Sequence, residues 1–116
     1  MLIKTNDVVI RYLRFRRGPG ALNKNGDGIE LLTGASNVVI DHNSLTWGVD
    51  GTLDSYGEAQ NFTYSWNIIA ETLEESTSLR DDGTCCEAHS KANLVGDIGS
   101  PGNIIDTPQS LCSQPF

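Results

Sequence analysis

The sequence repeats itself, and this constrains its fold more than any other feature. Three segments, residues 6–15, 37–45 and 61–69, share a run of β-branched and aromatic residues and recur after 30 and 24 residues. Two columns of this alignment are apolar in every copy: Ile10, Ile40 and Tyr64, and Phe15, Leu45 and Ile69. Such residues favour strands, and Gly, Asn and Ser punctuate them as turn residues do.

A second pair of segments lies between the first three. Residues 27–31 (Asp-Gly-Ile-Glu-Leu) and 50–54 (Asp-Gly-Thr-Leu-Asp) match at an offset of 23, and a polar turn follows each. Because one repeat cannot bury its own apolar face, short strands at this spacing predict stacked coils. We expect an all-β fold, a right-handed single-stranded parallel β-helix of about three to four coils.

An antiparallel sandwich is the competing fold. It requires tight hairpin turns such as Asn-Gly between paired strands. Asn25-Gly26 is the one Asn-Gly dipeptide in the sequence, and the residues before it do not have the pattern of a strand. In the β-helix, Asn6, Asn37 and Asn61 are expected at the corners, where Asn tolerates left-handed backbone and bonds its stacked neighbours.

The predicted organisation is one domain. Residues 1–97 form the coils, and residues 98–116 are an irregular tail that contains Pro108 and Pro115. A solenoid needs caps, and neither end supplies an amphipathic helix, so we expect both ends to be truncated.

Composition excludes some partners. The net charge of 8 − 15 = −7 disfavours binding to nucleic acid, and no apolar run is long enough to span a bilayer. No signal peptide is visible at the start of the chain. Cys85 and Cys86 are adjacent and Cys112 is distant, which indicates neither a zinc site nor a disulfide framework and leaves the compartment open.

Three aspartates form the candidate metal site. If the 23-residue offset holds, Asp27 stacks on Asp50 about 4.8 Å away, and Asp54 shares a strand face with Asp50. Carboxylates this close repel one another unless a cation neutralises them, and hard oxygen ligands suit Ca²⁺. The alternative is that Asp-Gly marks two solvated turns.

Other charged residues favour structural interpretations when taken alone. His42 follows Asp41 and is expected to be a hydrogen-bonded structural residue, and Lys91 to be a surface lysine. Four arginines near residues 11–17 form a basic cluster, which is either a solvated face or a contact for an acidic sugar. No Gly-x-Ser-x-Gly motif is present, so a serine hydrolase is not indicated.

Taken together, these motifs resemble the pectate lyases of polysaccharide lyase family 1. Residues 38–47 resemble the family's Val-Trp-Ile-Asp-His signature, and residues 26–29 and 50–54 resemble its calcium segments. Residues 61–67 are similar to its Val-Thr-Ile-Ser-Trp-Asn coil, and residues 89–96 to the coil that carries its substrate-binding lysine. The resemblance covers about residues 6–97, with five motifs in the family's order.

The resemblance implies a function. It implies calcium ligands at Asp27, Asp50 and Asp54, a uronate contact at Lys91, and a structural His42. The family cleaves polygalacturonate by β-elimination, in which calcium acidifies the C5 proton and an arginine removes it, and its members are mostly secreted. This chain has no arginine after Arg80, so the catalytic base is unknown.

Two other functions stay open. The first is a non-catalytic β-helix that binds acidic glycan, which the missing arginine favours. The second is a pectin-acting glycoside hydrolase, which would use two or three carboxylates without calcium. The His89-Ser-Lys91 segment argues against the hydrolase.

Overall fold

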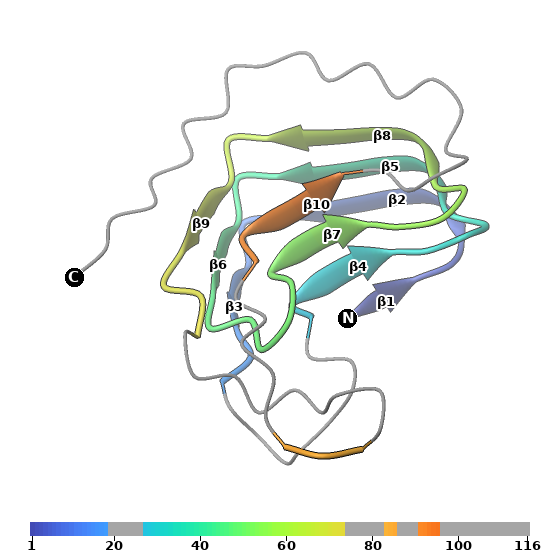
Figure 1. The fold of residues 1–116 in the computed structure, drawn as a ribbon. Coiled ribbons are helices and arrows are strands. Elements are labelled where there is room, and N and C mark those ends of the chain that lie inside the picture. Colours follow the sequence, from blue (N-terminus) through green and yellow to red (C-terminus); the bar gives the residue numbers. More distant parts are fainter. Residues whose placement is uncertain (19–26, 74–82, 86–90, 96–116) are drawn as a thin grey trace.

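The fold is a stack of parallel strands arranged in three sheets (Figure 1). The computed structural model describes residues 1–18, 27–73, 83–85 and 91–95. The first sheet contains β1 (Leu2–Ile3), β4 (Ile29–Leu31), β7 (Leu53–Ser55) and β10 (Asn93–Val95). The second contains β2 (Asn6–Arg11), β5 (Ser36–Asp41) and β8 (Gln60–Ser65), and the third contains β3 (Arg14–Arg16), β6 (Ser44–Thr46) and β9 (Ile68–Ala70).

The chain visits the three sheets in turn and then returns to the first. Each coil therefore contributes one strand to each sheet, and every strand pair is parallel. Strands β1–β3, β4–β6 and β7–β9 make three coils, and β10 opens a fourth. This confirms the parallel β-helix, and it excludes the antiparallel sandwich for the described part of the chain.

The predicted apolar columns are confirmed in the second and third sheets. Ile10 pairs with Ile40 and Ile40 with Tyr64, and Phe15, Leu45 and Ile69 pair in the same way. Both sheets keep the offsets of 30 and 24 residues that the sequence repeats show. The columns point inward, since Ile40 and Leu45 of the middle coil have no exposed surface.

The core is a single apolar column that runs along the axis of the coils. It comprises Ile3, Ile10, Ile29, Leu31, Ala35, Val38, Ile40, Leu45, Leu53 and Ala59. The second coil contributes most of the side chains that are fully buried, because it has a complete coil on each side. Each coil therefore depends on its neighbours for burial, as expected for a solenoid.

The corner residues confirm one part of the asparagine prediction and correct another. Asn37 and Asn61 have φ of 53° and 49°, and the Asn61 side-chain amide donates to Asn37 Oδ1. The third member is Asp7, not Asn6: Asp7 has φ of 58° and its Oδ1 accepts from Asn37 Nδ2 at 2.9 Å, whereas Asn6 pairs with Ser36. Asp tolerates the left-handed region as Asn does.

A buried asparagine satisfies the backbone where the second sheet turns into the third. Asn43 is 2% exposed; its Oδ1 accepts from the Leu13 backbone N–H at 3.0 Å and its Nδ2 donates to the Ile10 carbonyl at 3.0 Å. Asn67 repeats the pattern one coil on, since its Oδ1 accepts from Asn43 N and its Nδ2 donates to Ile40 O. Sequence reasoning had assigned Asn43 no role.

The three corners differ in how much chain they contain. Two residues separate the second sheet from the third in every coil, namely 12–13, 42–43 and 66–67. The corner between the third sheet and the first varies instead, with residues 17–28, 47–52 and 71–92. The corner between the first sheet and the second varies less, with residues 4–5, 32–35 and 56–59, so the largest length variation lies in the corner that leads into β4, β7 and β10.

The structure bears on three further expectations, which concern the cysteines, the C-terminal tail and membrane-spanning segments. Cys85 is disulfide-bonded, which the odd cysteine count did not predict, and the other two cysteines, Cys86 and Cys112, lie outside the described residues. The tail at residues 98–116 also lies outside them and stays a prediction. Within the ranges given above, no helix has the length and apolarity needed to cross a membrane.

We expect Asn43→Ala to destabilise the chain strongly. The substitution leaves the Leu13 N–H and the Ile10 carbonyl without their side-chain partner in a buried turn, at a cost of about 2 kcal/mol or more in unfolding free energy. Chemical denaturation followed by circular dichroism measures this cost. Asn6→Ala is the matched control, because Asn6 is exposed and should change stability by less than about 0.5 kcal/mol. Equal effects of the two variants would contradict the role of Asn43.

Candidate functional site

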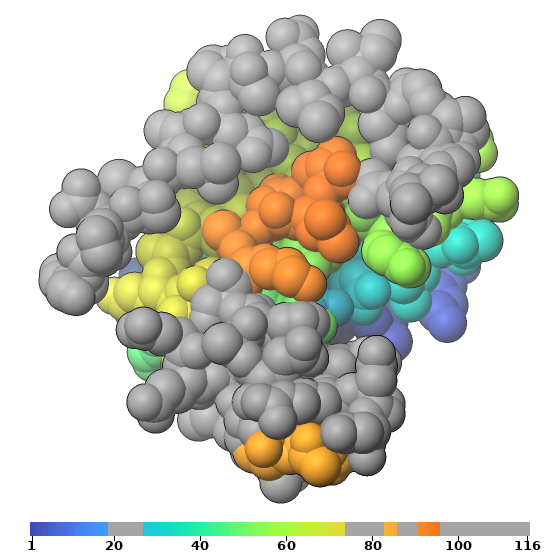
Figure 2. Space-filling model, viewed as in Figure 1, coloured from blue at the N-terminus to red at the C-terminus, as the bar shows by residue number. Residues whose placement is uncertain are grey.

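Acidic side chains gather on the outer face of the first sheet. The register pairs Leu2 with Glu30, Glu30 with Asp54, and Asp54 with Leu94. Paired residues in parallel strands point to the same side, so Glu30 and Asp54 lie next to each other on adjacent coils. Strand β10 lies beside β7, which in turn lies beside β4, in the space-filling view (Figure 2).

This register corrects the expected stacking of Asp27 on Asp50. The offset between β4 and β7 is 24 residues, since Ile29 pairs with Leu53, and the Asp-Gly match had suggested 23. Asp27 therefore lies opposite Gly51, whose backbone N–H donates to Asp27 Oδ1 at 2.6 Å. Asp50 precedes β7 and does not share a strand with Asp54.

The Asp54 side chain is buried and fixed by its neighbours. It is 5% exposed, and its Oδ1 accepts from the Leu94 N–H at 2.9 Å. Its carboxyl group lies against Gly51, where an added Cβ would come within 1.9 Å of Asp54 Oδ2, so a side chain at this position would displace the carboxyl group. Burial raises the pKa of Asp54 to about 7, and the charges of Asp27 and Asp50 add to it despite the Leu94 hydrogen bond and the charge of Lys91.

Glu30 belongs to the same cluster, and sequence reasoning missed it. Burial raises the pKa of Glu30 to about 7, followed by a side-chain hydrogen bond with Asp27 and by the charges of Asp27, Asp54 and Asp50. Two carboxyl groups can share a hydrogen bond only when one is protonated, which agrees with the raised pKa. A 24-residue offset, which places Glu30 beside Asp54, was the signal that would have identified it.

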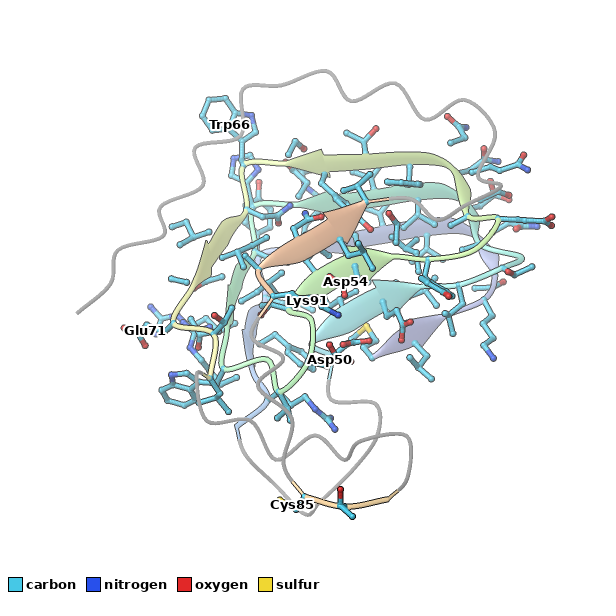
Figure 3. All side chains as sticks on the ribbon, in the orientation of Figure 1. Asp50, Asp54, Trp66, Glu71, Cys85 and Lys91 are labelled. Carbon is cyan, nitrogen blue, oxygen red and sulfur yellow. The ribbon has the colours of Figure 1, made fainter. Side chains whose placement is uncertain are left out.

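Lys91 reaches the cluster from the next coil. Its Nζ donates to Asp50 Oδ1 at 3.2 Å, and its backbone N–H donates to the Asp50 carbonyl at 2.9 Å. Figure 3 shows Lys91, Asp50 and Asp54 gathered beside β7. The structure therefore brings the predicted substrate residue to the predicted metal residues.

The cluster carries negative charge that its neighbours do not fully offset. Lys91 lowers the pKa of Asp54, and Asp27 and Glu30 interact with the amino group of Met1, yet the pKa values of Glu30 and Asp54 remain raised. Within the described ranges, no group of three or more His, Cys, Asp or Glu side chains is arranged to hold a metal ion as the chain stands. Their carboxylates are engaged instead by Gly51, Lys91 and Leu94.

The donor chemistry nevertheless fits a hard divalent cation. Carboxylate oxygens are the ligands that Ca²⁺ prefers, and a bound cation would offset both the burial and the repulsion between carboxylates that raise the pKa values of Glu30 and Asp54. Asp54 Oδ2, beside Gly51, is not engaged by the Leu94 hydrogen bond. The residues present thus supply oxygen donors of the kind that Ca²⁺ prefers, although their present arrangement does not form a metal site.

The Asp41–His42 pair lies in a different polar network. Asp41 Oδ2 is 2.7 Å from Arg11 Nε and 2.8 Å from His42 Nδ1, and Asp41 Oδ1 accepts from Ser65 Oγ at 2.6 Å. These hydrogen bonds, that of Ser65 first, hold the pKa of Asp41 below its ordinary value. His42 therefore has the hydrogen-bonded surroundings expected of a structural residue.

His42 is also the centre of an aromatic column. Its ring centroid is 5.5 Å from that of Tyr12 and 6.1 Å from that of Trp66, and all three residues have φ between 52° and 57°. Trp66 projects from the end of this column and is 81% exposed (Figure 3). The Arg11 guanidinium lies 4.9 Å from the centroid of the Tyr12 ring, so part of the basic cluster is structural.

The raised pKa values predict how stability depends on pH without divalent cations. Between about pH 4 and pH 7 the folded chain holds protons on Glu30 and Asp54 that the unfolded chain has lost. This contribution to stability is complete below the unfolded pKa values and is lost as the pH rises through about 7. We expect thermal unfolding in EDTA to show a lower midpoint at pH 7.5 than at pH 5.

The variant Glu30→Gln tests the cause, because it removes one of these titrations and leaves the others. Its midpoint should fall less between pH 5 and pH 7.5 than that of the original chain. Glu58→Gln, at an exposed position between β7 and β8, is the control and should keep the original pH dependence. An unchanged pH dependence in Glu30→Gln would contradict the assignment.

Comparison with known proteins agrees with the motifs. The chain is 42% identical over 69 residues to a probable pectate lyase C of Emericella nidulans, a match that covers 60% of this chain and 16% of the relative. Probable pectate lyases C of Aspergillus fumigatus and Aspergillus terreus match over the same length at 36% and 38% identity. No family model and no solved structure matched.

The chain thus spans about a sixth of the length of the curated relatives that it matches. The match covers 60% of its residues, and the fold described above is a stack of parallel coils. Sequence, fold and comparison together confirm the resemblance: over these 69 residues the chain is similar to pectate lyases.

Proposed function

We propose that the chain carries the calcium and uronate platform of a pectate lyase-like polysaccharide lyase. The observation that supports this most is the juxtaposition of Lys91 with the acidic cluster of Asp27, Glu30, Asp50 and Asp54. Carboxylates alone would repel an anionic sugar. A cation bound by these carboxylates, together with the neighbouring ammonium group of Lys91, would attract it. The similarity to probable pectate lyases supports the same substrate class.

In this proposal each residue has a defined task. Asp27, Asp50 and Asp54 hold Ca²⁺, and Lys91 contacts a carboxylate of polygalacturonate. Gly51 leaves the space that the Asp54 carboxyl group occupies, and the Leu94 N–H fixes the orientation of that group. Bound calcium would polarise the uronate carboxylate and so make the C5 proton more acidic.

The proton acceptor is left unassigned. The chain has no arginine after Arg80, which lies outside the described residues, and the four arginines of the first coil include Arg11 and Arg16, engaged by Asp41 and by Ser44. This absence favours a second candidate function, namely binding of acidic glycan without cleavage. Both functions use the same platform, so they differ in product and not in the requirement for calcium.

Secretion is part of the proposal. A disulfide at Cys85 is typical of chains that fold in an oxidising compartment, and polygalacturonate is an extracellular polymer. Secretion is expected also from the resemblance to the family.

Asp54→Asn is expected to weaken calcium binding at least about tenfold, because it removes a charged ligand but keeps the acceptor for the Leu94 N–H. Isothermal titration calorimetry measures the affinity. Asp7→Asn is the matched control: Asp7 lies at a corner of the second sheet, and its substitution should leave calcium binding unchanged.

The same variant has a second signature. Without calcium at pH 8, Asp54→Asn should raise the thermal midpoint, because it removes a repelled charge, while calcium should no longer raise it further. A calcium-dependent increase equal to that of the original chain would exclude Asp54 as a ligand.

The substrate is tested with polygalacturonate in calcium and in EDTA. A lyase generates an unsaturated product that absorbs in the ultraviolet, and we expect this product to need calcium and to be lost in Asp54→Asn. Calcium-dependent binding of polygalacturonate without this product would support the non-catalytic function instead. Reducing ends without unsaturation, formed equally in EDTA, would favour a hydrolase.

A further inference from the structure

Asp50 belongs to two parts of the site at once. Its Oδ1 accepts from Lys91 Nζ at 3.2 Å, and its charge also acts on Glu30 and Asp54. Asp50, which we expect to bind the cation, thus also binds Lys91, which we expect to contact the substrate. Nothing in the sequence indicated this contact, because Asp50 and Lys91 are 41 positions apart.

The backbone of Lys91 is anchored independently of its side chain. Its N–H donates to the Asp50 carbonyl at 2.9 Å, and its carbonyl accepts from Thr52 Oγ1 at 3.3 Å. Two residues later β10 begins to pair with β7, since Asn93 is opposite Leu53. The point from which the Lys91 side chain extends is therefore fixed on the preceding coil.

The side-chain contact, in contrast, is easy to release. The Lys91 and Asp50 side chains are 44% and 21% exposed, and an exposed ion pair of this kind contributes little free energy. A cation bound at Asp50 would compete for the same carboxylate and would also repel the ammonium group. Release therefore costs little and is favoured by charge.

We propose that Asp50 exchanges Lys91 for the divalent cation, so that cation binding frees the Lys91 ammonium group for a uronate carboxylate. This inference depends on the proposed calcium platform and adds an order of events to it. Because coupling between two ligands is reciprocal, an anionic sugar that engages Lys91 should tighten cation binding by the same factor. In the absence of calcium, Lys91 stays on Asp50 and its ammonium group is not offered to substrate.

Lysine reactivity provides a direct test. The chain has three lysines, Lys4, Lys24 and Lys91, and the exposed Lys4 is an internal standard. The rate of reductive methylation at each lysine is measured by mass spectrometry of peptides from the full chain, in EDTA and in calcium. We expect calcium to raise the ratio of the Lys91 rate to the Lys4 rate about two- to fivefold, the protection that an exposed ion pair gives.

Four variants separate release of Lys91 from a general effect of charge. In Asp50→Asn, Lys91 should react fast already in EDTA, since its partner is lost. Lys91→Gln should bind calcium more tightly than the original chain, because its competitor is gone, whereas Lys91→Arg should resemble the original. Lys4→Gln should leave calcium affinity unchanged.

The outcomes distinguish this inference from the proposed function. Calcium binding detected by calorimetry, together with an unchanged Lys91 to Lys4 ratio, would overturn the exchange and leave the calcium platform intact. No calcium binding at all would overturn the platform, and the exchange with it. A Lys91 rate in Asp50→Asn equal to that of the original chain in EDTA would also overturn the exchange.

Discussion

The structure depends on backbone hydrogen bonds between successive coils, because they fix the register of every side chain. Between β4 and β7 this register is a 24-residue offset, in which the Gly28 N–H donates to the Gly51 carbonyl and the Ile29 N–H to the Thr52 carbonyl. The coils approach closely here, since an added Cβ at Gly28 would come within 2.4 Å of the Thr52 carbonyl oxygen. A slip of one residue would turn Asp54 from the outer face toward the core.

Much of the fold could be predicted because two sheets repeat with constant spacing. The six-residue strands of the second sheet carry Val8, Val38 and Phe62 and, two residues on, Ile10, Ile40 and Tyr64. Longer strands with inward apolar positions in every coil define their alignment unambiguously. The buried Asn43 could not be recognised, because its importance comes from the backbone groups of Ile10 and Leu13 on the preceding coil.

The site was harder to predict because its strands are short. Strands β4 and β7 have three residues each, and their most conspicuous feature, the repeated Asp-Gly, lies before them and is out of step by one. The apolar pair Ile29 and Leu53 carried the correct alignment, and with it Glu30 would have joined Asp54. The three aspartates and Lys91 could be predicted from motifs in the sequence. Their contacts, such as the Asp50–Lys91 ion pair, became visible only in the folded structure.

The variable corner has a consequence for how such a chain can change. Residues 17–28, 47–52 and 71–92 all lead into the first sheet, so most of the extra chain between the described strands enters next to Asp27, Asp50 and Lys91. The corner between the second and third sheets keeps two residues in every coil and the corner between the first and second has two to four, while this corner accepts six residues in one coil and 22 in another. These differences in length leave the pairing of the strands in the second and third sheets continuous. The architecture therefore tolerates changes of chain length beside the acidic cluster while the scaffold is preserved, which makes this corner a natural place for loop grafting.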